Sequence, residues 1–298
     1  MEYKKQHWVP QSYLRAWCDP NVVPPENDYV WIYKKDGTLW KRKSPENIFF
    51  EPDMYTIHLD DGTRILDIEH GLSGLESLFT KIRRESINTK SELSPDDKLI
   101  ILAFIAASFE RTKMKRDYHK KFWGEIVEYA ENLKKYMLSL TPEERKRKSV
   151  NSSSGESSLS LDDAKRLAEN PLQEMLITSI NTSVEMFRPM CLRFLHTTSQ
   201  LGFITSDAPC VWFDREAIKR PVPYNQPGLA FPTIEITLPV SPQFMAYLTW
   251  KGNTTYIEIP DYLVNEYNRR TRYFCNEYFV VNQKIVNPYW LDPGKPPK

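Results

Sequence analysis

Four polar residues that are far apart in the sequence carry side chains suited to proton transfer and charge stabilisation: His7, Glu69, Arg111 and Asp207. An imidazole or a carboxyl group can exchange a proton with a substrate, so His7 or Glu69 could act as general base. A guanidinium binds phosphate oxygens through a planar fork of donors, so Arg111 could stabilise charge that develops there. Asp207 could orient His7. If the four residues converge, the chemistry they favour is cleavage of a phosphodiester.

Each of these residues also has a structural interpretation. His7 and Tyr13 could fix the N-terminal segment by hydrogen bonds, while neighbouring aromatic residues fill a hydrophobic pocket. Glu69 lies at the edge of an apolar helix face, where it could form an ion pair or face solvent. Asp207 follows a predicted strand in "FITSDAP" and could close a turn there. The two interpretations differ in a testable way, because catalytic groups line an open cleft whereas a structural network is closed and fully hydrogen-bonded.

Four further residues are candidates for substrate binding: Tyr13, Arg116, Ser206 and Asn268. Arg116 offers a second cation near Arg111. Ser206 lies at the end of a predicted strand, where loops concentrate functional side chains. Asn268 offers an amide that could bridge a carboxylate and a ligand, and its alternative is a place on a helix surface. Aromatic residues of the N-terminal segment could stack on bases, and these are Trp8, Tyr13 and Trp17.

Several common classes of enzyme are disfavoured by the sequence. It contains no GxSxG, P-loop, GxGxxG or HExxH motif and no CxxC pair, so it predicts no bound metal and no cofactor. Forty basic and thirty-nine acidic residues give a net charge of +1, which indicates no bulk attraction to nucleic acid or membrane. The longest apolar run is too short to span a bilayer, and the four cysteines lie far apart. We therefore expect reduced thiols and a cytoplasmic location.

The order of predicted elements indicates an α+β protein with an N-terminal β-hairpin region, a central helical bundle and a C-terminal antiparallel sheet. Residues 1–63 are β-rich, with turns at Asp36-Gly37 and Asp61-Gly62. Residues 64–190 show helical periodicity, and residues 191–290 alternate as short strands before a final helix. We expect a single domain over 1–298.

Within the helical region, "SPDD" at residues 94–97 predicts the start of a helix, because serine is a good N-cap and proline suits the first turn. The apolar stretch that follows belongs at the centre of the fold. A break is expected near Gly124. The segment near 141–163 is rich in charge and serine, and we expect a mobile loop there.

A set of ordered motifs resembles a known family. These motifs are "HWVPQSYLRAW", "WIYKKDGTLWKRKSPENIFFEPDMYTI", "ILDIEHGLSGLE", "FIAASFERTKMKR", "FITSDAP", "LPVSP" and "NEYNRRT". Together they resemble a bacterial and fungal family catalogued as domain of unknown function 4238, over roughly residues 5 to 281. The family pattern has a histidine followed by proline where His7 and Pro10 stand, and an arginine pair where Arg111 and Arg116 stand. Lys113 replaces a usual proline. The resemblance implies no settled reaction.

Three functions remain open at this point. The first is a metal-independent phosphodiesterase or ribonuclease-like enzyme, in the setting of a toxin or phage-defence effector. RNA is the favoured partner because its 2′-hydroxyl supplies an internal nucleophile. The second is a non-catalytic interaction module, in which the polar cluster is a structural salt-bridge network. The third is a sensor of a nucleotide or another anionic small molecule. Oligomeric state is not predicted.

Overall fold

The structure, a computed structural model, describes residues 5–22, 28–148 and 159–292. Its α-helices are α1 (Gln11–Leu14), α2 (Asp67–Ile82), α3 (Pro95–Glu110), α4 (Lys113–Ser139), α5 (Pro142–Lys148), α6 (Leu161–Glu169), α7 (Pro171–Phe187) and α8 (Asp261–Phe274). Its strands in the first half of the chain are β1 (Lys5–His7), β2 (Val30–Lys34), β3 (Leu39–Lys43), β4 (Phe50–Pro52), β5 (Ile57–His58) and β6 (Arg64–Ile65). Those in the second half are β7 (Cys191–His196), β8 (Thr205–Ser206), β9 (Val211–Asp214), β10 (Ile234–Ser241), β11 (Phe244–Thr249), β12 (Tyr256–Glu258) and β13 (Tyr278–Val281). The fold is α+β, as predicted.

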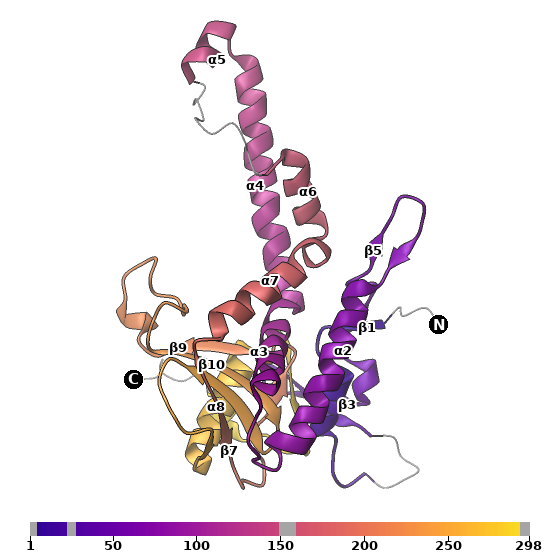
Figure 1. Cartoon of the computed structure of the whole chain (residues 1–298), viewed down its shortest axis with the longest axis vertical. Helices are drawn as coiled ribbons and strands as arrows, with labels where there is room; N and C mark the ends of the chain where they lie inside the picture. Colours follow the sequence, from indigo (N-terminus) through magenta and orange to yellow (C-terminus); the bar gives the residue numbers. More distant parts are fainter. Residues whose placement is uncertain (1–4, 23–27, 149–158, 293–298) are drawn as a thin grey trace.

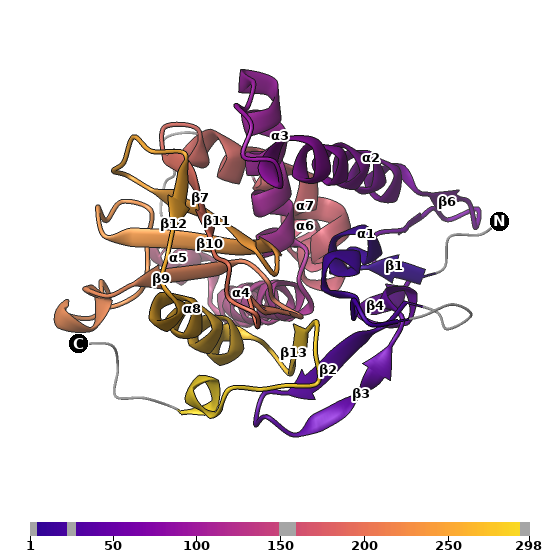
Figure 2. The ribbon, with the colours of Figure 1, turned by 90° about the horizontal axis from the view of Figure 1, so that it is seen from below.

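The C-terminal half forms a five-stranded sheet in the order β12-β7-β11-β10-β9. Its strands pair antiparallel except for β12, which runs parallel to β7. Side chains alternate across the sheet, so Ala246 and Leu248 face the main core while Met245 and Tyr247 face α8. Helices α3 and α7 cover one face and α8 covers the other (Figure 2). The sheet is therefore buried on both faces.

A second sheet joins the two ends of the chain, which the sequence did not predict. Its order is β3-β2-β13-β8, so the hairpin that turns at Gly37 pairs with the last strand. Gly37 has a φ of 87°, a left-handed conformation that favours glycine. The predicted turn at Gly62 is also present, between β5 and β6, with a φ of 82°.

The N-terminal segment is seated on the C-terminal sheet by buried hydrogen bonds. The Tyr13 hydroxyl donates to the Pro239 carbonyl oxygen at 2.7 Å, and the Trp17 indole N–H donates to the Phe203 carbonyl oxygen at 2.8 Å. Both rings are buried, with exposures of 1% for Tyr13 and 0% for Trp17. The expectation that these two rings stack on bases is therefore wrong, because the core occupies both of their faces.

The helical region begins as predicted and breaks at a different place. Ser94 caps α3, and Asp97 completes the reciprocal pair of hydrogen bonds of a capping box. The break comes at Arg111 and Thr112, because the Thr112 hydroxyl caps α4. The family pattern has proline where Lys113 stands, and the break between the helices forms here without that proline. Helix α4 continues through Gly124 without interruption.

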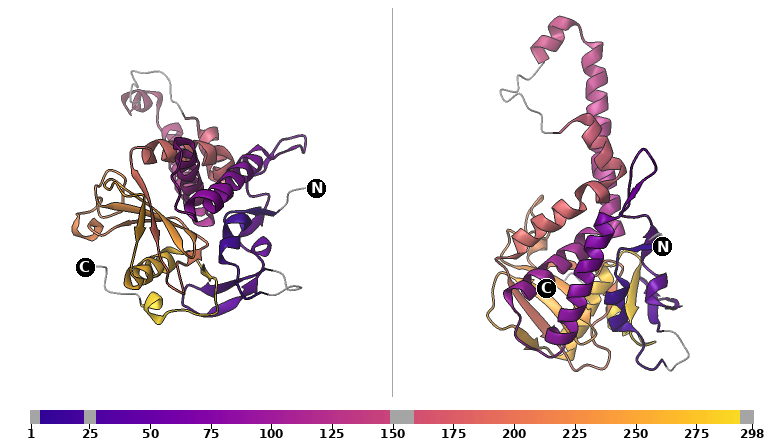
Figure 3. Two further views of the ribbon diagram at one scale, coloured as in Figure 1. Left: turned by 60° about the horizontal axis from the view of Figure 1, so that its bottom comes forward. Right: turned by 45° about the vertical axis from the view of Figure 1, so that its right-hand side comes forward.

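Helices α4, α5 and α6 form an arm that extends away from the sheets (Figures 1 and 3). No residue of α4 is buried. The described part of the segment predicted as a loop is helical instead, since a capping box between Thr141 and Glu144 starts α5 and another between Ser160 and Asp163 starts α6. Residues 149–158 lie outside the described residues. Among the helices that the structure describes, none is long and apolar enough to cross a membrane.

Candidate functional site

A two-stranded ribbon places His7 at the surface. β1 pairs with β4 so that His7 lies opposite Phe50, and their rings are 5.5 Å apart. The neighbouring Gln6 points to the other side, where it is fully buried. Its side-chain amide donates to Thr56 at 2.9 Å and its oxygen accepts the backbone N–H of Tyr55 at 2.5 Å. Gln6 thereby fixes the ribbon that presents His7.

Helix α2 presents a line of polar side chains towards the same place. Glu69, Ser73 and Glu76 share one helix face because they are spaced by four and then three residues. Asp67 is exposed and lies on another face. The opposite side of α2 buries Ile68, Leu72 and Phe79, which set the rotation of the helix. The packing of the apolar stripe therefore decides where the glutamates point.

These side chains line a pocket of about 370 Å³, together with Lys5, Gln11 and Glu46. His7, Glu69 and Glu76 are half-buried, while the other lining residues are exposed and form a rim that opens to solvent. We call this hollow the proton-transfer pocket, after the two lining side chains, His7 and Glu69, that can exchange protons with a bound molecule. The structure brings together His7 and Glu69 as the sequence predicted. It adds Glu46 and Glu76, which the sequence analysis missed although the spacing of Glu76 from Glu69 was a usable signal.

Arg111 lies behind the pocket and does not line it. Its side chain is 1% exposed, and its Nη1 donates to Glu76 Oε1 at 2.6 Å. Nε and Nη2 are buried and have no hydrogen-bond partner among the described residues. The prediction that the Arg111 fork contacts a phosphate is wrong in this structure, because the side chain is buried, pairs with Glu76 and does not line the pocket. Arg111 is a positioning residue that holds the carboxylate of Glu76.

Tyr55 ties the two halves of the pocket together. Its hydroxyl is within hydrogen-bonding distance of two carbonyl oxygens, that of His7 at 3.3 Å and that of Arg111 at 3.5 Å. The residue is fully buried. The ribbon and the end of α3 therefore share a single anchor, which the sequence analysis did not identify because tyrosine at a buried loop position has no distinctive local pattern.

The pocket lowers the pKa of His7 and raises the pKa of Glu69. Burial lowers the pKa of His7, and the nearby Arg111 cation adds to this, although a hydrogen bond to the Glu46 carbonyl oxygen opposes it. Burial raises the pKa of Glu69 to about 7, and the Glu76 carboxylate adds to this. At neutral pH the imidazole is mostly neutral and Glu69 is partly protonated. One base and one acid thus coexist in one pocket.

Glu69→Gln is expected to stabilise the protein at alkaline pH. Folding raises the pKa of Glu69 from 4.5 to about 7, so the folded state binds this proton more tightly, and that contribution is lost as the pH rises through 7. Glutamine mimics the protonated form at every pH. The variant should gain about 1–2 kcal/mol over the wild type at about pH 8.5, after allowance for solvent screening, and almost nothing at about pH 4. Urea denaturation at both pH values measures this, with Asp67→Asn as control. Equal differences at both pH values would contradict the assignment.

Asp207 does not lie in the proton-transfer pocket. Both of its oxygens accept backbone N–H groups, from Asn276 at 2.8 Å, Glu277 at 2.8 Å and Tyr278 at 3.1 Å. Burial raises its pKa to about 6 although these bonds favour the ionised form. The predicted role of Asp207 in orienting His7 is therefore wrong, because its acceptors are used to fix the start of β13.

The predicted substrate-binding residues also have structural partners. Tyr13 is buried against Thr205 and Pro239. Ser206 is buried, and its hydroxyl accepts the backbone N–H of Ala208, so it closes a turn. Asn268 is fully buried and joins Gly202 and Ile204 through both ends of its amide. Arg116 pairs with Glu51 and Asp117. None of these four lines the proton-transfer pocket.

The described residues contain no group of three or more His, Cys, Asp or Glu side chains placed to hold a metal ion.

A family model described as a protein of unknown function, DUF4238, matches residues 5–284. The chain belongs to this family, as the ordered motifs predicted. Comparison with curated proteins gave no match, and comparison with solved structures gave none either.

Proposed function

We propose that the proton-transfer pocket is the active site of a metal-independent phosphodiesterase that acts on RNA. One observation carries this proposal: a neutral imidazole and a carboxyl group with a pKa of about 7 line the same solvent-open pocket. A general base and a general acid work best when their pKa values lie near the working pH. A structural network would instead be closed to solvent and fully paired.

The reaction that suits these groups is intramolecular transfer within RNA. His7 accepts the proton of the 2′-hydroxyl, and the 2′-oxygen forms a bond to phosphorus. The bond from phosphorus to the 5′-oxygen breaks, and Glu69 gives its proton to that oxygen. The products are a 2′,3′-cyclic phosphate and a 5′-hydroxyl. Because the substrate supplies the nucleophile, the protein needs to supply only the base and the acid.

Three carboxylates line the pocket, those of Glu46, Glu69 and Glu76, and two effects reduce their negative charge. Arg111 neutralises Glu76, and partial protonation of Glu69 reduces its charge. Lys5 lies at the rim with an exposed side chain. In this proposal Lys5, and not Arg111, binds the phosphate oxygen of the substrate. Its Nζ donates to Asn47 at 3.0 Å, which directs the ammonium group along the rim.

His7→Ala is expected to lower the rate of RNA cleavage by about 10²–10⁴-fold, and Glu69→Gln by a similar factor. Cleavage of a short single-stranded RNA is followed with a chelator present, and the products are identified by their termini. Two matched controls stand outside the pocket: His58→Ala on the exposed β5–β6 hairpin and Asp67→Asn on another face of α2. The rate of the wild type should depend on pH as a bell whose limbs follow His7 and Glu69. Product with a 5′-phosphate would contradict the mechanism.

A second function is favoured by part of the structure. Asp207, Asn268 and Tyr13 form closed, paired networks that hold the N-terminal segment and β13, as an interaction module requires. If the folded wild type leaves RNA intact across the pH range, and expression in bacterial cells leaves cellular RNA and growth unchanged, the module is the better description. RNA loss that depends on His7 would instead support a toxin or phage-defence role.

A further inference from the structure

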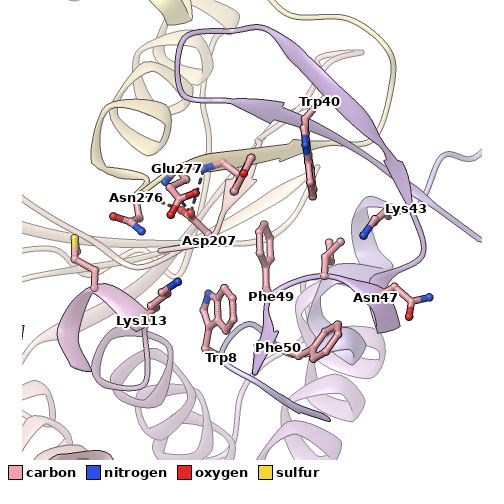
Figure 4. Close-up of a pocket in the computed structure, with 13 residues that line it drawn as sticks. Trp8, Trp40, Lys43, Asn47, Phe49, Phe50, Lys113, Asp207, Asn276 and Glu277 are labelled. Atoms are coloured by element: carbon pink, nitrogen blue, oxygen red, sulfur yellow. Dashed lines mark hydrogen bonds between the residues drawn. The ribbon is translucent and has the colours of Figure 1, made fainter. Parts of the chain in front are cut away.

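A second pocket lies beside the ribbon that carries His7, and Phe50 of that ribbon lines it. Its volume is about 290 Å³. Figure 4 shows Trp8 and Phe49 on one side of it and Trp40 on the other. Trp40 lies against the ring of Tyr278, 4.9 Å away, and Trp8 lies against Phe49, 5.8 Å away. Two aromatic walls therefore face a common space, which we call the aromatic pocket.

The carboxylates of the aromatic pocket lie together at one end. Asn276, Glu277 and the buried Asp207 lie at one end, and Lys43 and Asn47 lie at the other (Figure 4). Lys113, which pairs with Glu51 at 3.5 Å, lies beside Trp8. Lys43 has no ion pair with a carboxylate of the described residues, and its ammonium group is 5.4 Å from the ring of Trp40. One end thus offers hydrogen bonds of both kinds, and the other offers the positive charge of Lys43.

Two further observations indicate a ligand. The indole Nε1 of Trp8 is buried and has no hydrogen-bond partner among the described residues, although buried donors are nearly always paired. Phe49 has a φ of 54°, an unfavourable backbone conformation for a residue with a side chain. The Trp8 backbone N–H donates to the Phe49 carbonyl oxygen at 2.9 Å and so helps to hold this conformation. Such strain concentrates at ligand sites.

We propose that the aromatic pocket binds one unpaired nucleobase, with the phosphate attached to it directed towards Lys43. A planar base stacks on Trp40 with its edge turned towards Trp8, because aromatic side chains stack on every base. The Trp8 N–H gives a hydrogen bond to a ring nitrogen or carbonyl oxygen of the base. Asn276 and Glu277 face its polar edge, where an amide and a carboxylate can pair with exocyclic groups.

The position of the pocket indicates why the base belongs to RNA, an assignment that rests on the proposed function. Successive residues of the chain line the two pockets: His7 and Glu46 line the proton-transfer pocket, while Trp8 and Asn47 line the aromatic pocket. Lys5 spans the boundary through its hydrogen bond to Asn47. A strand of RNA with one base held against Trp8 would therefore bring its neighbouring phosphate to Lys5 and His7.

The test measures binding and not cleavage. Adenosine and uridine monophosphates are titrated into the full chain and followed by isothermal calorimetry, with ribose 5-phosphate as a ligand that lacks the base. Both nucleotides should bind at least tenfold more tightly than ribose 5-phosphate. A short single-stranded RNA, titrated into the His7→Ala variant to prevent turnover, should bind at least tenfold more tightly again, because it reaches Lys5 as well. A mononucleotide that binds as tightly as the RNA overturns the assignment to RNA.

Three variants locate the site. Trp40→Ala removes one wall at a residue that is 37% exposed, so the fold should tolerate it, and it should weaken nucleotide binding about tenfold or more. Trp8→Phe keeps the ring, loses the unpaired N–H and should weaken binding several-fold. Tyr129→Ala, at an exposed aromatic residue of the α4 arm, should bind as the wild type does. Binding that is unchanged in both tryptophan variants, or that is equal for ribose 5-phosphate, overturns the proposal. Binding without any RNA cleavage would leave this site standing and remove the proposed reaction.

Discussion

Asp207→Ala is expected to lower the free energy of unfolding by about 2–4 kcal/mol, because three backbone N–H groups at the start of β13 lose their acceptor. The Asp207 side chain is almost fully buried, so water replaces it poorly. Asp207→Asn keeps one acceptor oxygen and should lose less. Urea denaturation measures both, with an unchanged dependence on urea concentration as the sign that the folded state is intact.

Glu277→Gln is the matched control, since Glu277 is exposed and its hydrogen bond to Asp207 comes from its backbone N–H, which the substitution keeps. It should change stability by less than about 0.5 kcal/mol. If Asp207 instead orients His7, Asp207→Asn would abolish RNA cleavage while leaving stability close to that of the wild type. That outcome would reverse the correction made from the structure.

Arg111→Met is expected to destabilise the fold by about 2–4 kcal/mol and to slow RNA cleavage. It removes the partner of Glu76 and leaves that carboxylate half-buried and unpaired. The Glu76 side chain is 20% exposed, so water can partly solvate it and the loss of stability should lie towards the lower end of this range. Without the guanidinium, the pKa of His7 should rise, because the Arg111 cation helps to lower it. The acid limb of the pH profile should therefore move to higher pH.

A double-mutant cycle separates the pair from its parts. Glu76→Gln leaves the buried Arg111 guanidinium without an anionic partner, so the two single variants should each be costly, and the double variant should cost about 1–3 kcal/mol less than their sum. Arg188→Met serves as control, because Arg188 pairs with Glu185 where both side chains are exposed. It should cost under about 1 kcal/mol. Additive effects of Arg111 and Glu76 would show that they do not act as a unit.

Features that depend on a few adjacent residues could be predicted from the sequence. The turn at Asp36-Gly37 and the cap at Ser94 are examples, because the conformation of glycine and the serine hydroxyl act within a few residues. The pairing of β13 with β2 was not predicted. It joins residues at opposite ends of the chain, and alternation in a strand does not name the partner.

Only those parts of the candidate site that depend on local sequence could be predicted. His7 and Glu69 share a pocket because a ribbon and a helix each present one polar face to it, and the helix face was visible from the spacing. Asp207 was wrongly included. A strand-end aspartate has the same local sequence whether it accepts N–H groups from a distant turn or faces a substrate, so only the three-dimensional contacts distinguish the two.

The seating of the N-terminal segment has a consequence for the growing chain. Every side chain that lines the proton-transfer pocket belongs to the first third of the polypeptide, and Arg111 behind it follows soon after. The carbonyl oxygens that receive the Tyr13 hydroxyl and the Trp17 indole lie 226 and 186 residues further on. During translation the pieces of the pocket therefore emerge early, but the buried Tyr13 hydroxyl lacks its Pro239 acceptor until β10 has been made. A nascent chain that stalls before Pro239 carries all of these groups and lacks the surface that holds them in place.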